Sequence, residues 1–285
     1  MKAPSSEAVA EAAEVLRGGG LVLMPTETVY GLAVDATNPA AVAAVYEAKG
    51  RPSFNPLIVH VADIEAARMI AAFDAQALAL AEAFWPGPLT IVALALADCR
   101  VCDLARAGMD TVAVRAPAHP AALALLKAFA GPICAPSANR SGRPSPTTLA
   151  AAMEETGFAA QAALDGGPCA VGLESTVVSV MEGRVRLLRP GGLARGSIEA
   201  LVGPLCEAED DARPCRRGGV GARLGVGEQL PDGGDVGLPI EPEPELLLGQ
   251  AQLPDLRRVE LGAGLEVLGR DAELPGKHPQ RLDRR

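Results

Sequence analysis

The sequence predicts an α/β domain in which a largely buried sheet is covered by helices. Helix and strand signals alternate along residues 1 to 203, and the strand candidates are short apolar runs. This alternation is typical of sheets with helices packed on their faces. The pattern is lost beyond about residue 203, so we expect the domain to end there.

The first half of the domain follows from capping and breaker signals. Residues 6–17 predict a helix, and three glycines then precede the apolar strand "LVLM". The segment "NPAAVAAVYEAKG" predicts a helix with Asn38 as N-cap, Pro39 at its first position and Gly50 just past its end. "PLIVHV" reads as a strand, and "DIEAARMIAAF" and "DAQALALAEAF" as helices that each open with an aspartate.

The second half continues the alternation. Strands are predicted for "LTIVALAL", "TVAVRAP", "PICAPS", "STVVSV" and "RVRLLRP". "HPAALALLKAFAG" predicts a helix with Gly131 past its end. The last two strands are separated only by "MEGR", which predicts a β-hairpin.

Residues 204–285 have a different composition. From position 206 on, 13 Gly and 8 Pro occur among 80 residues, and scattered leucines keep no helical or strand period. We expect a Gly/Pro-rich tail that is disordered or lies outside the family of the first domain. A small second domain is the alternative.

Bulk properties narrow the classes of function. The net charge of -9 argues against a broad nucleic-acid-binding surface but allows a local basic pocket. The N-terminus has no apolar signal region, and no run reaches the length of a membrane span, so we expect a cytoplasmic protein without membrane contact. The single CxxC, Cys99 and Cys102, has no second ligand pair, which leaves no predicted metal site.

Polar clusters at strand ends are the candidates for chemistry, since no P-loop, GxSxG or HExxH motif occurs. They include five cations: Lys49, Arg51, Arg115, Arg143 and Arg189. Strand alternation places Ile58 with His60 on one face, and Thr111 with Arg115 on one face. Ordinary turns, cations at a helix end and a core histidine would explain each cluster separately. Together the clusters predict a focused anion site.

Seven motifs then occur in the order typical of one family: "PTETVYGLA", "KGRPSFNPLIVHV", "FWPGPLT", "VAVRAP", "APSANRSGRPSPT", "GLESTVV" and "RPGG". Across residues 7 to 203 the chain resembles the YrdC/Sua5 family of threonylcarbamoyl-AMP synthases. The resemblance implies a twisted, open α/β sheet with a concave basic cavity. It also implies synthesis of L-threonylcarbamoyladenylate from L-threonine, bicarbonate and ATP, with release of pyrophosphate, for the N6-threonylcarbamoyladenosine at position 37 of tRNA.

The resemblance assigns roles to twelve residues. Threonine would be held by Thr28, His60, Arg115, the backbone at Ala135 and Ser175. ATP would be held by Arg51, Asn55, Thr111, Ser137, Ser145 and Arg189, and Lys49 and Arg51 would act in catalysis by placing charge near the phosphates. Mg²⁺ would arrive with the nucleotide. Further implied partners are downstream enzymes that transfer the threonylcarbamoyl group to tRNA, with weak binding of tRNA or double-stranded RNA.

The chain departs from the longer family members after the first domain. Those members continue into a linker with a P-G-M-x-x-x-H-Y-x-P element, whereas this chain has no tyrosine after Tyr46. The tail is therefore divergent, or it is an out-of-frame translation of GC-rich DNA. Two alternatives to the synthase also stay open: an RNA-binding module, and a regulatory or hydrolytic relative that only binds a nucleotide or cleaves the adenylate.

Overall fold

A computed structural model describes residues 4–206. Its helices are α1 (Ser6–Arg17), α2 (Pro39–Lys49), α3 (Ile64–Arg68), α4 (Ala75–Phe84), α5 (Pro120–Phe129), α6 (Leu149–Thr156) and α7 (Arg195–Val202). Its strands are β1 (Val22–Met24), β2 (Gly31–Asp35), β3 (Ile58–His60), β4 (Leu89–Leu94), β5 (Thr111–Arg115), β6 (Ile133–Cys134), β7 (Ala162–Ala163), β8 (Thr176–Met181) and β9 (Arg184–Arg189). The tail predicted for 204–285 lies outside the described residues from position 207 on.

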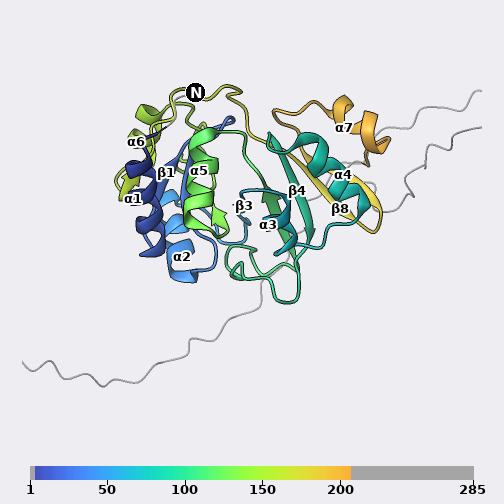
Figure 1. The fold of residues 1–285 in the computed structure, drawn as a ribbon, viewed down its shortest axis with the longest axis horizontal. Helices are drawn as coiled ribbons and strands as arrows, with labels where there is room; N and C mark the ends of the chain where they lie inside the picture. Colours follow the sequence, from blue (N-terminus) through green and yellow to red (C-terminus); the bar gives the residue numbers. More distant parts are fainter. Residues whose placement is uncertain (1–3, 207–285) are drawn as a thin grey trace, which may run out of the picture. The chain divides into compact units, whose positions relative to one another are not determined.

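The strands of this part of the chain form one mixed sheet in the order β7-β1-β2-β6-β3-β5-β4-β8-β9. Strands β3 and β5 are parallel, as are β4 and β8, and most other neighbours are antiparallel. At one end of the sheet α1 packs against α5, and at the other α4 packs against α3 and α7 (Figure 1). The predicted twisted α/β sheet with flanking helices is confirmed.

Local sequence signals account for the helix starts and ends. Asn38 Oδ1 accepts from the amides of Ala40 and Ala41, and Gly50 ends α2 at φ 57°, as predicted. Asp63 and Asp74 cap α3 and α4 through their side chains. Helix α5 ends at Phe129, so Gly131 lies past its end as predicted, and the left-handed residue between them is Ala130, at φ 58°.

The last two strands form the predicted hairpin, β8–β9. Glu182 and Gly183 both have positive φ, 55° and 67°, which is the requirement of a type I′ turn. This turn matches the right-handed twist of the two strands, so a two-residue loop is enough to bring Arg184–Arg189 back along β8.

Some elements differ from the expectation. Helix α3 ends at Arg68, five residues before the predicted end, because Ala71 already pairs with Ala95 beside β4. Strand β2 was not predicted, because "GLAVD" directly follows a polar motif that reads as a turn. Helices α6 and α7 and the two-residue strand β7 were not predicted either.

The two faces of the β3-β5-β4-β8-β9 half of the sheet have different surroundings. Val59, Val114, Ile91 and Val178 belong to the main hydrophobic core. Their neighbours along the strands, such as His60, Arg115 and Val92, line a cavity on the opposite face. None of the helices between residues 4 and 206 is long and apolar enough to cross a membrane.

Candidate active site

The cavity has a volume of about 490 Å³, within the range of small-molecule sites. Its floor is built from cross-strand rows. One row runs Ile58–Ala113–Val92–Ser179–Arg186, and a neighbouring row contains the pair His60–Arg115. Successive rows lie two residues, or roughly 7 Å, apart along the strands. The floor therefore changes from polar at the His60–Arg115 row to mostly apolar at the next.

Arg115, at the end of β5, is 4% exposed and is held by three partners. Its Nη2 donates to Glu27 Oε1 at 2.5 Å, its Nη1 to Thr28 Oγ1 at 2.9 Å and its Nε to the Gly87 carbonyl at 3.1 Å. A guanidinium has five N–H groups, so two remain without a partner among the described residues. Because Arg115 lines the cavity, those two groups can bind a carboxylate in a bidentate manner.

The hydrogen bonds around Thr28 determine where its hydroxyl donates and where it accepts. Thr26 Oγ1 donates to the Val29 carbonyl at 2.6 Å and is 2.9 Å from Thr28 Oγ1. The single hydroxyl hydrogen of Thr26 is thus in use, so Thr28 must be the donor in the pair. Thr28 also accepts from Arg115, which leaves it one lone pair. Thr28 therefore offers the cavity an acceptor, suited to an amine or a hydroxyl of a ligand.

His60 is uncharged at neutral pH. Burial, followed by the neighbouring charge of Arg115, lowers its pKa to about 3. Its Nδ1 is buried and has no hydrogen-bond partner among the described residues. His60 as a residue lines the cavity beside Arg115, whereas its Nδ1 is shielded from solvent. His60 therefore adds a neutral imidazole, and no charge, to the cavity floor beside Arg115.

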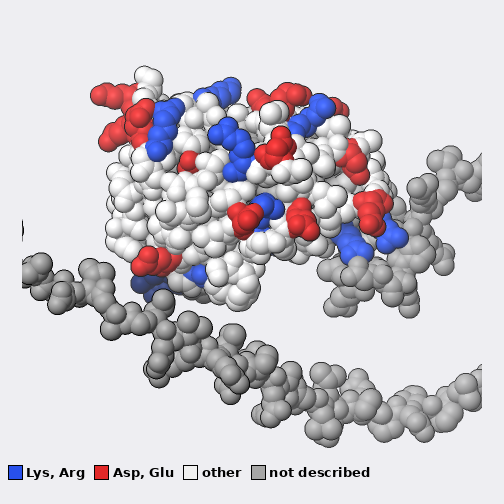
Figure 2. Space-filling view, turned by 90° about the horizontal axis from the view of Figure 1, so that it is seen from below, with Lys and Arg blue, Asp and Glu red and all other residues white. Residues whose placement is uncertain are grey.

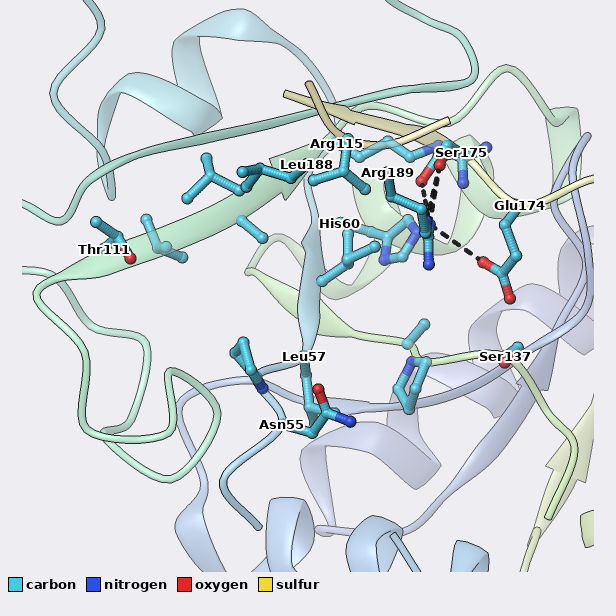
Figure 3. A pocket seen from close by; sticks show the side chains of 18 of the residues that line it. Asn55, Leu57, His60, Thr111, Arg115, Ser137, Glu174, Ser175, Leu188 and Arg189 are labelled. Carbon is cyan, nitrogen blue, oxygen red and sulfur yellow. Dashed lines mark hydrogen bonds and ion pairs between the residues drawn. The ribbon is translucent and has the colours of Figure 1, made fainter. Parts of the chain in front are cut away.

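Ser175 and Arg189 form the next part of the wall (Figure 3). Arg189 Nη2 donates to the Ser175 carbonyl at 2.9 Å and to Ser175 Oγ at 3.1 Å, and it lies 3.4 Å from Glu174 Oε2. Thr90 Oγ1 is 2.7 Å from Ser175 Oγ beneath them. Glu174 also accepts from Ser145 Oγ at 2.7 Å. This network ties the start of β8 to the end of β9.

The loop after α2 supplies Arg51 and Asn55. Arg51 donates to the carbonyls of Asn55 and Pro56 at 3.3 and 3.1 Å. Both Arg51 and Asn55 line the cavity, and Figure 3 shows Asn55 far from the Ser175–Arg189 wall. Burial lowers the pKa of Arg51, but its side chain keeps its charge because its normal pKa is so high.

Lys49 lies outside the cavity lining. It is 3% exposed, and its ammonium group donates to the carbonyls of Ser137 and Asn139. Burial, followed by the charge of Arg51, lowers its pKa to about 8. Ser137 itself lines the cavity, so Lys49 reaches the cavity only through this loop.

Ten of the twelve predicted site residues line this one cavity: Thr28, Arg51, Asn55, His60, Thr111, Arg115, Ala135, Ser137, Ser175 and Arg189. Lys49 and Ser145 do not. Arg143, one of the five candidate cations, pairs with Glu155 instead, Nη1–Oε1 2.8 Å, and is 55% exposed. The structure thus gathers residues from six of the seven motifs but places Arg143 on the surface.

Sequence reasoning did not single out Glu27, Arg106 or Arg186 as site residues. Glu27 holds Arg115, and Arg106 and Arg186 line the cavity. Glu27 lies within the quoted "PTETVYGLA" motif, so the sequence did mark this segment. Nothing in the motif indicates, however, that the Glu27 carboxylate pairs with an arginine 88 positions away. The cavity lining has five arginines and one carboxylate, Glu174, which confirms the predicted basic cavity.

A family model for Sua5/YciO/YrdC, described as "Telomere recombination", matches residues 14–191. The chain belongs to this family. The resemblance drawn from its seven motifs is therefore confirmed.

Two curated relatives extend this assignment. The threonylcarbamoyl-AMP synthase of Bacillus subtilis strain 168 is 46% identical over 198 residues, which are 69% of this chain and 57% of that protein. The putative threonylcarbamoyl-AMP synthase of Mycobacterium tuberculosis strain H37Rv is 36% identical over 199 residues, 70% of this chain and 90% of that protein. The chain thus spans a little over half the length of the longer relatives that it matches.

Solved structures of the family agree with the fold. Pyrococcus abyssi Sua5 complexed with L-threonine has a TM-score of 0.69 and 44% identity, covering 71% of this chain and 59% of that chain. Escherichia coli YciO has a TM-score of 0.59 at 20% identity, covering 66% of this chain and 91% of that chain, and supports the fold alone.

Proposed function

We propose that this Sua5/YciO/YrdC protein synthesises L-threonylcarbamoyladenylate from L-threonine, bicarbonate and ATP, and releases pyrophosphate. The observation that carries the proposal is Arg115 at the cavity floor, with two unpartnered N–H groups beside the acceptor Thr28 and the neutral His60. This is a site for a carboxylate that carries an adjacent amine, which is the shape of an α-amino acid. The relative whose structure contains L-threonine supports the choice of that amino acid.

The nucleotide would occupy the same cavity. Arg51, Arg189 and Ser137 line it together with Asn55 and Thr111, and arginine and hydroxyl groups suit phosphates. Mg²⁺ would enter as part of the ATP complex. The cavity lining has one carboxylate, Glu174, which is already bonded to Ser145 and Arg189, so the phosphates would be the main ligands of the metal.

The chemistry then requires positioning and charge stabilisation more than a side-chain nucleophile. The threonine amine reacts with bicarbonate, releasing water, or with CO₂, releasing a proton, to give a carbamate. A carbamate oxygen then attacks the α-phosphorus while pyrophosphate leaves. Holding both substrates in one cavity makes the second step effectively intramolecular. The arginines of the cavity would stabilise negative charge on the phosphates in the transition state.

The decisive experiment measures pyrophosphate release with ATP, bicarbonate and each amino acid in turn. Threonine-specific release supports the synthase. Pyrophosphate release or nucleotide cleavage that is independent of any amino acid indicates a hydrolytic relative instead. Arg115→Met should lose the response to threonine, and the matched variant Arg143→Met, on the surface, should keep it.

An RNA-binding role is the second candidate, and we give it less weight. On the face shown in Figure 2, basic and acidic side chains are interspersed and form no continuous basic stripe. Strongly salt-dependent RNA binding without threonine-dependent turnover would favour it over the synthase. We further propose that the protein acts in the cytoplasm, and that its product passes to enzymes that modify tRNA.

A further inference from the structure

The segment Ser137–Asn139 is held through its carbonyl groups. The Lys49 ammonium donates to the carbonyls of Ser137 and Asn139, and Thr156 Oγ1 donates to the carbonyl between them, that of Ala138, at 2.7 Å. Lys49 and Thr156 are 3% and 0% exposed, and neither lines the cavity. Three consecutive carbonyl groups are therefore bound by buried side chains outside the cavity.

The amide groups of the same segment are bound differently. The Ala138 amide donates to the Tyr30 carbonyl at 2.7 Å, and the Ser141 amide to the Lys49 carbonyl at 2.8 Å. The Ser137 amide has no hydrogen-bond partner among the described residues, although Ser137 lines the cavity. An amide without a protein partner, in a residue that lines a ligand site, is a candidate donor to an anion.

We infer that Lys49 is a positioning residue: it fixes the Ser137–Asn139 carbonyls so that Ser137 presents its amide and hydroxyl donors to a phosphate group in the cavity. A single ammonium group that bridges two carbonyls restricts the orientation of both peptide planes. Without this bridge the segment could rotate, and the orientation of the Ser137 amide would not be fixed. Lys49 also closes the last turn of α2, where a cation is favoured. The charges that act on it are Arg51 in the loop after α2, Glu174 before β8 and Glu155 on α6.

This differs from a direct contact between Lys49 and the phosphates. A direct contact would stabilise only the nucleotide-bound protein. A positioning role already acts before the nucleotide binds, because the carbonyl bonds exist without it. The two roles therefore predict different mobility of the Ser137–Asn139 segment in the nucleotide-free protein once Lys49 is replaced.

Hydrogen–deuterium exchange of the nucleotide-free, full-length chain tests the inference. Lys49→Met should speed exchange by about tenfold or more in the peptides covering residues 134–146, where Ala138 and Ser141 are the protected reporters. Thr156→Val, which removes only the bond to the Ala138 carbonyl, should speed it less. Lys127→Met, an exposed lysine on α5, is the matched control and should leave it unchanged.

Activity supplies the second measurement, and this part alone rests on the proposed function. Lys49→Met should lower kcat/KM for ATP by roughly 100-fold, within the range for loss of a preorganised backbone donor. Binding of threonine alone should change less than about threefold, since Lys49 has no contact at the Arg115 end.

The outcomes separate the ideas. If Lys49→Met loses turnover while exchange in residues 134–146 is unchanged, Lys49 acts as a direct phosphate ligand. That result would overturn the positioning role. Faster exchange in a protein whose wild type shows no threonine-dependent turnover would uphold the positioning role and reject the synthase. If Lys49→Met does not fold, the exchange of Thr156→Val decides, and no change there contradicts the inference.

Discussion

The two ends of the cavity are built by different means. At the Arg115 end, a buried ion pair and the register of the β-sheet hold the functional groups: Arg115 and Glu27 are each 4% exposed, and Arg115 lies opposite His60 on β3. At the other end, a cation that ends α2 and a cation in the loop after it are held by backbone carbonyls. Arg51 binds the Asn55 and Pro56 carbonyls, and Lys49 binds those of Ser137 and Asn139.

Because the two ends are held differently, substitutions at one end should mainly change stability and substitutions at the other should mainly change activity. Removing one member of a buried ion pair leaves the other charge buried and unpaired, so we expect changes at the Arg115 end to destabilise the whole domain. Removing a cation that binds carbonyls leaves neutral groups behind. We therefore expect changes at the loop end to impair nucleotide chemistry while leaving most of the folding free energy intact.

The largest effect is expected from Glu27→Gln. It leaves the Arg115 charge buried without its carboxylate and weakens the bond from the Ala118 amide to Glu27 Oε2, 2.9 Å. The free energy of unfolding should fall by roughly 3–5 kcal/mol, the usual cost of breaking a buried pair. Denaturant unfolding measures it, and affinity for threonine should fall in the same variant.

Two controls sharpen this test. Glu65→Gln removes an exposed carboxylate whose partner, Arg68, lies 3.5 Å away, and should leave stability unchanged. The double variant Glu27→Leu, Arg115→Met removes both charges and should be more stable than Glu27→Gln. A double variant that is less stable than the single one would mean that packing, and not the unpaired charge, causes the loss.

Arg51→Ala tests the loop end. Arg51 lines the cavity and binds only carbonyl groups of its own loop, so its loss should leave the melting temperature nearly unchanged. The kcat/KM for ATP-dependent pyrophosphate release should fall by about 10²- to 10³-fold. Arg68→Ala, an exposed arginine on α3, is the matched control. Near-normal turnover in Arg51→Ala would remove Arg51 from the nucleotide site, and a large loss of stability would break the contrast between the two ends.

The sequence predicted the Arg115 end better than the loop end. Strand alternation placed Ile58 with His60 and Thr111 with Arg115, and both pairs line the cavity, because a period of two is a property of the strand itself. For the loops, the sequence placed Lys49 and Arg143 at the cavity with equal reason. Only the fold decides that Lys49 lies beneath a loop and that Arg143 pairs with Glu155.

Contacts between residues far apart in the sequence were the second feature that the sequence could not predict. Glu27 and Arg115 belong to two quoted motifs, yet nothing in either motif states that they meet. Gly31, in "PTETVYGLA", reads as part of a turn, whereas it begins β2 and lies beside Ala135. A sequence motif identifies which residues matter to a site, and long-range contacts decide what each residue does there.

Gly191→Ala should have an intermediate effect at the Arg115 end. A Cβ at Gly191 would lie 2.4 Å from the Glu174 carbonyl oxygen and 2.5 Å from the Ser175 carbonyl carbon, so the backbone before β8 must move. We expect a loss of about 1–3 kcal/mol in unfolding free energy, together with weaker threonine binding through displaced Ser175. Gly196→Ala on α7, where a Cβ meets no atom within 4 Å, is the control and should be neutral or stabilising. Weaker threonine binding in the control as well would exclude the displacement of Ser175 as the cause.

The smallest expected effect is a pH dependence in which the titration of Lys49 changes stability and activity in opposite directions. Its pKa is lowered by burial from 10.5 to about 8, so the folded chain loses this proton before the unfolded chain does. Between these two pH values the unfolded state binds more protons, and the contribution of Lys49 to stability therefore rises with pH. The ammonium that positions Ser137 disappears over the same interval, so kcat/KM for ATP should fall above pH 8, by at most about tenfold per pH unit.

Lys49→Arg distinguishes this cause from others that titrate in the same range, including the amine of the amino acid. Arginine keeps its charge throughout, so the decline in kcat/KM above pH 8 should be absent from its profile, even if its activity at pH 7 is lower. Denaturant unfolding of the wild type at the same pH values should show no parallel loss of stability due to Lys49. A decline near pH 8 that persists in Lys49→Arg would assign the titration to another group. It would also leave the charge of Lys49 without a role at the loop end of the cavity.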